Sequence, residues 1–463
     1  MEDPKQLASL LRNAAQTAPD SPALVASNGV LSYRQLADMV SAIAGNLAFM
    51  GVKRGQIVGL NLPTQLHIPF MLAGFQLGVT VAMITPLTLA AGQVRADWIF
   101  SAAPFDEGAA EQQIIVTGAL LTPLEGSREI ALEGYASIDD DCLIVHSSGT
   151  TGTPKAAALS VRNVWARLAN LKYWVQELPY LTLFDMGAWI GLRSYLVHLT
   201  AAATFFVADK ALDALPIVHG NKLTHLECSV NQAPRLVEAV KAGGWQVSTL
   251  KSVVVTGATI SPALHDALEE AFDCAVLTRY GANEIDIVSA RNVDSRDPQF
   301  IGALLPGFEL RIEESGEVGI RSDSMVTGYL NNPEATAEHF RDGFFYPGDL
   351  VSLDADNQLR FHGRSKDIVN AGGQKISPLE IENAVIGRLG ITDAAGFAYL
   401  DHLGIEHFWL AVVGEGVDVV RLQGELQQQH GRLAPERVVS VEDIPRNANG
   451  KVTRHVLSER LDK

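Results

Sequence analysis

Short apolar segments alternate with longer segments of helical period along most of the chain. Runs such as "QIVGLNL" (56–62), "CLIVH" (142–146) and "LKSVVVTG" (250–257) have the length of buried strands, and a segment with helix-like spacing of apolar residues follows each one. Strands that alternate with helices are typical of βα units on largely parallel sheets. The pattern therefore predicts an α/β fold built from βα layers.

Helix start signals support this interpretation at two places. In "SPALHDALEEAF", Ser261 is a candidate N-cap and Pro262 occupies the first helical position. In "ISPLEIENAV", Ser377 and Glu380 have the spacing of a capping box on either side of Pro378. We expect a helix to begin at each of these positions.

The pattern of apolar and turn-forming residues changes near residue 300. The segments "GFELRIEESGEVGIRS" and "GFFYPGDLVSLDADNQLRFHGR" contain short apolar runs separated by Gly and Asp-Asn turns, which is typical of antiparallel strands. After "GRSKDIVNAGG" (363–373) the alternation of helix and strand returns. This charged, glycine-bearing junction is the best candidate for a domain boundary, and it separates a β-rich section from a small α+β section.

The charge balance limits the partners of the protein. The 463 residues include 36 Lys and Arg against 53 Asp and Glu, a formal net charge of −17. This charge argues against nucleic acid or an anionic membrane surface as partners, so an anionic substrate needs a local basic site. The three cysteines are far apart and flanked by apolar residues, and we find no signal peptide and no apolar run of 18 residues; we expect a soluble, cytoplasmic protein.

The most conspicuous polar segment is "HSSGTTGTPK", which ends at Lys155. Glycines allow backbone amides to approach a ligand closely, threonine hydroxyls can donate to phosphate oxygens, and a lysine adds a point charge. The Walker pattern does not fit, because Pro154 precedes the lysine and Ala156 follows it. The segment is either a polyphosphate site of another kind or a flexible surface turn with a solvated lysine.

Three further segments carry candidate chemistry. Glu284 of "YGANEID" follows the strand-like "AVLTR" and offers oxygen ligands to a hard cation such as Mg²⁺. Asp349 of "YPGDL" is expected in a tight turn, where a carboxylate can accept both hydroxyls of a ribose, and Arg364 at the end of a short strand can pair with ribose or phosphate oxygens. Each of these residue types, taken alone, is more commonly found at a solvated loop or surface position.

A basic cluster lies near the C-terminus. In "IPRNANGKVTR" an Asn-Gly turn presents Lys451, with Arg446 and Arg454 close to it in sequence. In an acidic chain such a cluster is a candidate anion site, although a solvated turn explains it equally well.

Taken in order, these segments resemble the ANL superfamily of adenylate-forming enzymes, which includes acyl-CoA synthetases, adenylation domains of peptide synthetases and luciferases. The matching segments are "SSGTTGTPK", "TGATISPAL", "YGANE", "GYLNNPEAT", "YPGDL", "GRSKDIVNAGGQKISPLEIE" and "PRNANGKVTR". The resemblance runs essentially from end to end. It implies a two-step reaction: a carboxylate attacks the α-phosphate of ATP to give acyl-AMP and pyrophosphate, and a thiol, most simply that of coenzyme A, then takes the acyl group.

The resemblance also assigns roles to residues. Lys451 and Lys155 are the expected catalytic lysines, Lys451 on the carboxylate and α-phosphate and Lys155 on the departing pyrophosphate. Thr150 or Thr151 and Glu284 are expected to hold Mg²⁺. The expected ATP and AMP contacts are Ser147, Ser148, Gly149, Thr150, Thr151, Gly152, Gly257, Ala258, Thr259, Tyr280, Gly281, Asn283, Asp349 and Arg364, and the expected acyl pocket contains Asp185, Trp189, Asn231 and Gly257.

Members of this family carry the second lysine on a small C-terminal domain that rotates between the two half-reactions. Lys366 matches the hinge position, which divides the chain into an adenylation core, residues 1–365, and a mobile domain, residues 366–463.

The sequence departs from the family pattern at several points. Ala156 stands where many members have glycine, Asn283 stands where threonine is common, and the stretch before "CLIVHSS" is shorter than usual. Asp185 of "FDMGAW" stands where most acyl-CoA synthetases have histidine, and amino-acid-activating members place an aspartate near there to pair with the α-ammonium of the substrate. The alternative function is therefore a stand-alone amino-acid or aryl-acid adenylating enzyme that loads the phosphopantetheine of a carrier protein. An Asp185 that points to solvent or caps a turn is the other explanation of this residue. A nucleotide-binding protein without catalysis is the third alternative.

Overall fold

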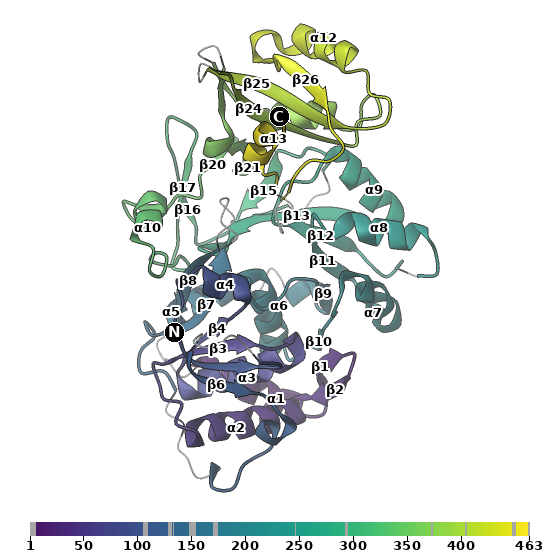
Figure 1. Cartoon of the computed structure of the whole chain (residues 1–463). Helices are drawn as coiled ribbons and strands as arrows, with labels where there is room; N and C mark the ends of the chain where they lie inside the picture. The colour runs from purple at the N-terminus through teal and green to yellow at the C-terminus, as the bar shows by residue number, and fades with distance from the viewer. Residues whose placement is uncertain are drawn as a thin grey trace.

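A computed structural model describes residues 6–104, 110–127, 132, 134–147, 154–169, 175–245, 247–291, 295–371, 374–402, 405–446 and 451–461. The first and last segments of the chain lie at opposite ends of the molecule, with the antiparallel section and the large central sheet between them (Figure 1). Among the described residues, none of the helices combines the length and apolar character needed to cross a bilayer.

The first layer is a six-stranded sheet with strand order β6-β5-β3-β4-β7-β8, in which only β8 runs antiparallel to its neighbour. A three-stranded sheet of order β10-β1-β2 lies beside it. The strands of these two sheets are β1 (Pro22–Ala26), β2 (Gly29–Ser32), β3 (Ile57–Asn61), β4 (Thr80–Met83), β5 (Ala96–Ser101), β6 (Ala110–Ile115), β7 (Asp141–Ser147), β8 (Lys155–Ser160) and β10 (Phe205–Phe206). The helices of this part are α1 (Gln6–Thr17), α2 (Tyr33–Phe49), α3 (Thr64–Leu77), α4 (Pro86–Ala90) and α5 (Val161–Leu168).

The central sheet has eight strands in the order β20-β21-β15-β14-β13-β12-β11-β9. The strands β9, β11, β12 and β13 are parallel, and the pairs from β13 to β20 are antiparallel. Its strands are β9 (Tyr180–Thr182), β11 (His225–Ser229), β12 (Ser252–Thr256), β13 (Ala275–Ala282), β14 (Asp286–Ala290), β15 (Phe300–Leu304), β20 (Asp349–Leu353) and β21 (Gln358–Arg364). The accompanying helices are α6 (Trp189–Thr200), α7 (Ala214–Asn221), α8 (Ala233–Lys241) and α9 (Pro262–Phe272).

The β-rich section after residue 300 forms a small antiparallel sheet of order β16-β17-β19-β18. Its elements are β16 (Glu309–Ile312), β17 (Val318–Arg321), the helix α10 (Pro333–His339), β18 (Phe340–Arg341) and β19 (Phe344–Phe345). The antiparallel arrangement predicted for this section is confirmed.

The last part of the chain contains a two-stranded and a three-stranded sheet, the latter of order β24-β25-β26. Its elements are β22 (Val369–Ala371), β23 (Gln374–Ile376), α11 (Pro378–Val385), β24 (Asp393–Leu400), β25 (Glu406–Val413), α12 (Val419–His430), β26 (Arg437–Ser440) and α13 (Arg454–Leu461). The prediction of an α/β fold with a β-rich section and a small α+β section is thus confirmed.

Buried side chains of the described residues gather in separate clusters rather than in one core. The cluster around α1, α2 and α3 and the cluster of α7, α8 and α9 contain residues before 340. Two other clusters, which include Phe408 and Phe397, contain only residues from 369 onward. The last part of the chain therefore has hydrophobic cores of its own.

The two predicted helix starts are correct, but their caps differ. The hydroxyl of Ser261 accepts from the backbone N–H of Leu264, as a good N-cap does. The capping box at Ser377 is wrong: the helix begins at Pro378, yet the Ser377 hydroxyl makes no cap bond and donates instead to the carbonyl of His362 at 2.5 Å. A contact with β21 replaces the local one here.

Candidate active site

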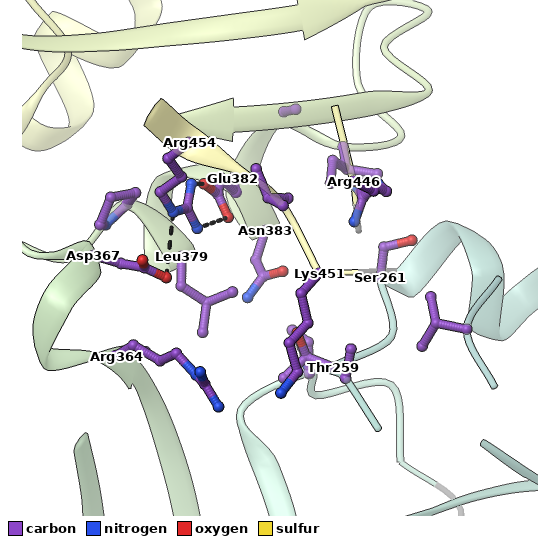
Figure 2. Close-up of a pocket in the computed structure, with 18 of the residues that line it drawn as sticks. Thr259, Ser261, Arg364, Asp367, Leu379, Glu382, Asn383, Arg446, Lys451 and Arg454 are labelled. Atoms are coloured by element: carbon purple, nitrogen blue, oxygen red, sulfur yellow. Dashed lines mark hydrogen bonds and ion pairs between the residues drawn. The ribbon is translucent and has the colours of Figure 1, made fainter. Parts of the chain in front are cut away.

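A cavity of about 1480 Å³ lies between the central sheet and the last part of the chain. One wall is formed by the segment that follows β12 and by the second half of β13, and the other by α11 and α13. Figure 2 shows the labelled side chains of this cavity, with Lys451 and Arg364 pointing into the same space. Residues predicted from distant sequence segments therefore meet at one place.

Seven of the expected nucleotide residues line this cavity together: Gly257, Ala258, Thr259, Tyr280, Gly281, Asp349 and Arg364. Gly257 has a φ of +100°, which glycine adopts without strain, and the space beside its Cα is open. A Cβ on Gly281 would lie 2.2 Å from the carbonyl oxygen of Asp286, so the close approach of β13 and β14 requires glycine there. The strand β13 continues through Ala282, three residues beyond the strand predicted from "AVLTR".

Tyr280, Asp349 and Arg364 form one polar group. The Tyr280 hydroxyl donates to Oδ2 of Asp349 at 2.8 Å, and Nε of Arg364 lies 3.2 Å from Oδ1. The expectation that Asp349 lies in a tight turn is wrong, because it opens strand β20 and pairs in register with Arg364 at the end of β21. The carboxylate is buried and its two oxygens are held by residues of two other strands.

Lys451 lines the same cavity. Burial, together with the nearby Arg364, lowers the pKa of Lys451 to about 8, although Asp349 and Glu284 favour its charged form. The Asn-Gly turn predicted before it lies in residues 447–450, outside the described residues. The neighbouring arginines are paired: Arg446 with Asp393 at 2.7 Å and Arg454 with Glu382 and Asp367. Lys451 is thus the member of the predicted basic cluster whose charge is directed at the cavity.

Of the expected phosphate loop, only the two ends are described. Ser147 ends β7 and Lys155 begins β8, and the two residues face each other in the antiparallel register. The residues between them that were expected to bind phosphate or Mg²⁺ lie outside the described residues: Ser148, Gly149, Thr150, Thr151 and Gly152. A connection between paired strands brings its ends together, so both termini of the loop are fixed by the sheet.

The backbone that carries Lys155 is held on both sides. The amide of Ala156 donates to Oε1 of Gln93 at 2.6 Å, and its carbonyl accepts from the amide of Leu330 at 2.8 Å. The Lys155 ammonium lies 3.0 Å from Nε2 of His339 and 5.0 Å from the ring centroid of Tyr329. Burial lowers the pKa of Lys155, and Glu284 opposes that shift.

Glu284 is a buried carboxylate near both lysines. Its Oε1 accepts from the Tyr329 hydroxyl at 2.7 Å, and its charge favours the protonated forms of Lys155 and Lys451. A buried carboxylate with oxygen ligands fits a hard cation such as Mg²⁺. The other expected ligand, Thr150 or Thr151, is outside the described residues.

Asn283 does not line the cavity, and its side chain instead makes hydrogen bonds to two other segments, at His146 and Trp189. Its Oδ1 accepts from the backbone N–H of Trp189 at 3.0 Å, and its Nδ2 donates to the carbonyl of His146 at 2.7 Å. The helix α6 begins at Trp189 and its N-cap, Ala188, offers no side-chain acceptor, so Asn283 supplies one from another element. The amide thereby ties the end of β7, next to Ser147, to the start of α6.

The expected acyl-pocket residues are not brought together. Asn231 and Gly257 line the cavity. Trp189 is buried, with its indole 4.6 Å from the Arg167 guanidinium and its Nε1 donating to Asp286 at 2.5 Å. Asp185 is exposed, and its Oδ1 accepts from the backbone N–H of Gly187 at 2.9 Å, which is the geometry of a turn cap.

Sequence reasoning missed the end of helix α10 as part of the site. Besides His339 beside Lys155, Glu338 pairs with the exposed Lys366 at 2.8 Å. One turn of helix therefore contacts both the phosphate-loop lysine and the residue expected at the hinge. The segment "NNPEATAEHF" gives no local signal for these contacts, because both partners are remote in sequence.

The chemistry available at this site is the binding of anions that must approach each other. Lys451 and Arg364 provide positive charge in the cavity, and Asp349 and Tyr280 offer oxygen partners to hydroxyl groups. Lys155 adds a third positive charge near Glu284, although it does not line the cavity itself. Low exposure strengthens these electrostatic interactions.

Comparisons with known proteins agree with one another. The family model of AMP-binding enzymes matches residues 11–330. The chain is 27% identical to an oxalate–CoA ligase of Arabidopsis thaliana, with 99% of both chains covered, and 26% identical to a 3-hydroxybenzoate–CoA ligase of Aromatoleum sp. (strain CIB), with 96% and 95% covered. Its fold is similar to that of ATP-bound MatB from Rhodopseudomonas palustris (TM-score 0.85, 22% identity, 100% and 99% covered). It is also similar to MenE, the O-succinylbenzoate coenzyme A synthetase of Bacillus subtilis, in complex with ATP and a magnesium ion (TM-score 0.81, 19% identity, 96% and 98% covered).

Proposed function

Because the chain belongs to the family of AMP-binding enzymes, we propose that it activates a carboxylic acid with ATP as acyl-AMP and transfers the acyl group to the thiol of coenzyme A. The observation that carries this proposal is the position of Lys451, a partly buried lysine beside Arg364 and Asp349 in the cavity that Tyr280 and Gly257 also line. The CoA-ligase relatives support the same reaction class.

In the first half-reaction two anions must come together, the carboxylate of the substrate and the α-phosphate of ATP. Lys451 reduces their repulsion, and its effect is large because the ammonium is shielded from water. Lys155, at the end of the phosphate loop, stabilises the charge that develops on pyrophosphate as it leaves. In this proposal the reacting oxygens lie between the two lysines.

The nucleoside part of ATP has matching partners. Asp349 accepts from ribose hydroxyls while it keeps the hydrogen bond from Tyr280, and Arg364 turns from Asp349 to ribose or phosphate oxygens. Tyr280 and the segment Gly257–Thr259 flank the base. Glu284, with Thr150 or Thr151, would hold Mg²⁺, which would neutralise phosphate charge when bound.

The second half-reaction needs a different arrangement of the same chain. We place a boundary after residue 365 and a hinge at Lys366, so that residues 366–463 rotate as a unit and withdraw Lys451 from the cavity. The separate hydrophobic cores from residue 369 onward support such a unit, since few buried side chains would have to part.

For the acceptor thiol, the relatives favour coenzyme A over the phosphopantetheine of a carrier protein. An acid with an amine beside its carboxylate is not favoured, because Asp185 is exposed and caps a turn. Since no disulfide joins Cys142, Cys228 and Cys274, all of which are described, we further propose a reducing, cytoplasmic location.

The proposal is tested by incubating the full chain with ATP, Mg²⁺ and an array of carboxylic acids, first following pyrophosphate release and then adding coenzyme A or a phosphopantetheinylated carrier. We expect release with at least one acid and an acyl-CoA product by mass spectrometry. A thioester on the carrier alone would favour the alternative acceptor. The absence of pyrophosphate release with every acid would overturn the proposal.

A further inference from the structure

His339, the last residue of helix α10, lies against the phosphate-loop lysine. Its Nε2 is 3.0 Å from Nζ of Lys155, and its Nδ1 is 2.8 Å from the carbonyl oxygen of Tyr346. A carbonyl can only accept, so Nδ1 carries the proton and Nε2 presents its lone pair to the ammonium. The two contacts together fix the tautomer and the orientation of the ring.

The ring itself is held by packing. Tyr329 lies edge-on to it with centroids 6.0 Å apart, and Phe345 lies on another side at 6.4 Å. Tyr329 in turn places its ring 5.0 Å from the Lys155 ammonium and donates its hydroxyl to Glu284. These contacts fix the position of the imidazole, which can therefore accept a hydrogen bond from the Lys155 ammonium in one direction. The side chain of Lys155 can still move through its methylene groups.

We propose that His339 is a positioning residue for adenylation, which accepts a hydrogen bond from the Lys155 ammonium and directs it to the phosphates of ATP. This inference rests on the proposed function. A neutral imidazole suits the task, because it orients the ammonium without neutralising its charge, whereas a carboxylate would cancel the charge that the phosphates need.

The neighbouring carboxylate supports this division of roles. Glu338 lies next to His339 in sequence, but its Oε1 pairs with Nζ of Lys366 at 2.8 Å, whereas its Oε2 is 3.9 Å from Nε2 of His339. The ion pair with Lys366 lowers the pKa of Glu338 and keeps it charged. At the end of α10, the Glu338 carboxylate therefore pairs with Lys366, and the neutral His339 ring accepts from Lys155.

Two substitutions separate the hydrogen bond from the packing. His339→Phe keeps an aromatic ring between Tyr329 and Phe345 but has no acceptor, while His339→Gln keeps an acceptor oxygen without the ring. With an acid that supports pyrophosphate release, we expect His339→Phe to lower the rate constant of ATP–pyrophosphate exchange about 10- to 100-fold, because a displaced catalytic group loses activity of that order. His339→Gln should recover most of the rate.

A double-mutant cycle with Lys155→Ala tests whether His339 acts through the lysine. In the Lys155→Ala background His339→Phe should cause no further loss, and acyl transfer from synthetic acyl-AMP to coenzyme A should be unchanged in every variant. His407→Gln, at a partly exposed histidine of β25 paired with Asp401 and Glu436, is the matched control and should exchange like the wild type.

Equal loss from His339→Phe in both backgrounds, an equal loss in the acyl-transfer step, or wild-type exchange by His339→Phe would each overturn the inference. If the wild-type chain performs no exchange with any acid, the proposed function fails instead, so the two failures are distinguishable.

Discussion

The Tyr280 hydroxyl donates a 2.8 Å hydrogen bond to Asp349, although their strands, β13 and β20, are separated in the central sheet by β14, β15 and β21. The bond therefore joins side chains rather than neighbouring backbones. It closes one side of the cavity and orients a carboxylate at the place where we propose that a ribose binds.

Tyr280→Phe should raise the KM for ATP about 10-fold with little change in kcat. The substitution removes one hydrogen bond to a charged group, worth about 1.5 kcal/mol, that orients Asp349 in both the ground state and the transition state. Initial rates of pyrophosphate release at varied ATP would measure it, with Tyr399→Phe, remote from this bond, as control. A lowered kcat at unchanged KM would contradict this role.

Lys451→Ala should lower the adenylation rate at least about 100-fold, because the charge that offsets the repulsion of two anions is removed. Transfer of the acyl group from pre-made acyl-AMP to coenzyme A should continue at nearly the wild-type rate, since Lys451 is assigned to the first step alone. The two half-reactions are measured separately by ATP–pyrophosphate exchange and by acyl-CoA formation. A parallel loss in both would show that the substitution damages the fold or that the assignment is mistaken.

The pH profile of adenylation should fall on the alkaline side near pH 8. The pKa of Lys451 is lowered to about 8, so the reactive ammonium form dominates below that pH and is lost as the pH rises through it. The alkaline decrease of kcat/KM, which reports the free enzyme, should have an apparent pKa near 8. The decrease of kcat should have a higher apparent pKa, because bound anions favour the ammonium form of Lys451. ATP–pyrophosphate exchange is the suitable assay, since it avoids the titrating thiol of coenzyme A, and a flat profile up to pH 10 would refute the prediction.

Asn283→Ala should reduce the free energy of unfolding by about 2 kcal/mol. It deprives the first amide of α6 of its acceptor and the His146 carbonyl of its donor, which combines the loss of a helix cap with a buried unpaired group. Urea unfolding would measure the change. Asn383→Ala is the matched control, because the amide nitrogen of Asn383 makes no hydrogen bond within the described part of the chain; similar losses in both variants would exclude the proposed bracing role.

Asp185→Asn should leave the spectrum of accepted acids unchanged. Asparagine retains the oxygen that accepts from Gly187, and the residue is exposed, so both the turn and the cavity are preserved. The same array of acids, run with both proteins, provides the measurement. A selective loss of acids that carry an amine would restore the amino-acid-activating alternative.

Local patterns in the sequence predicted the fold well where the stabilising contacts are themselves local. The alternation of apolar runs identified β3, β7 and β12, and the Ser261 cap was correct because its partner lies three residues away. The capping box at Ser377 failed because the hydroxyl finds the carbonyl of His362, which belongs to a different strand. A sequence pattern cannot rank a distant acceptor against a nearby one.

The same distinction applies to the site. Lys451, Asp349 and Arg364 were identified by motif, and the fold does bring them to one cavity. Asn283 and His339 could not be assigned their contacts, because their partners lie 137 and 184 residues away in the chain. Their side chains make hydrogen bonds to residues that are remote in the chain, and no nearby sequence pattern indicates such bonds.

Because the residues from 369 onward have hydrophobic clusters of their own, they can unfold on heating before the rest of the protein does. Phe397 and Phe408 belong to clusters that share no member with those of the preceding part within the described residues, so melting of that portion need not disturb the walls around Gly257 and Tyr280. We therefore expect the protein to lose catalytic activity at a lower temperature than it loses ATP binding. Between those temperatures the protein would still sequester ATP without consuming it.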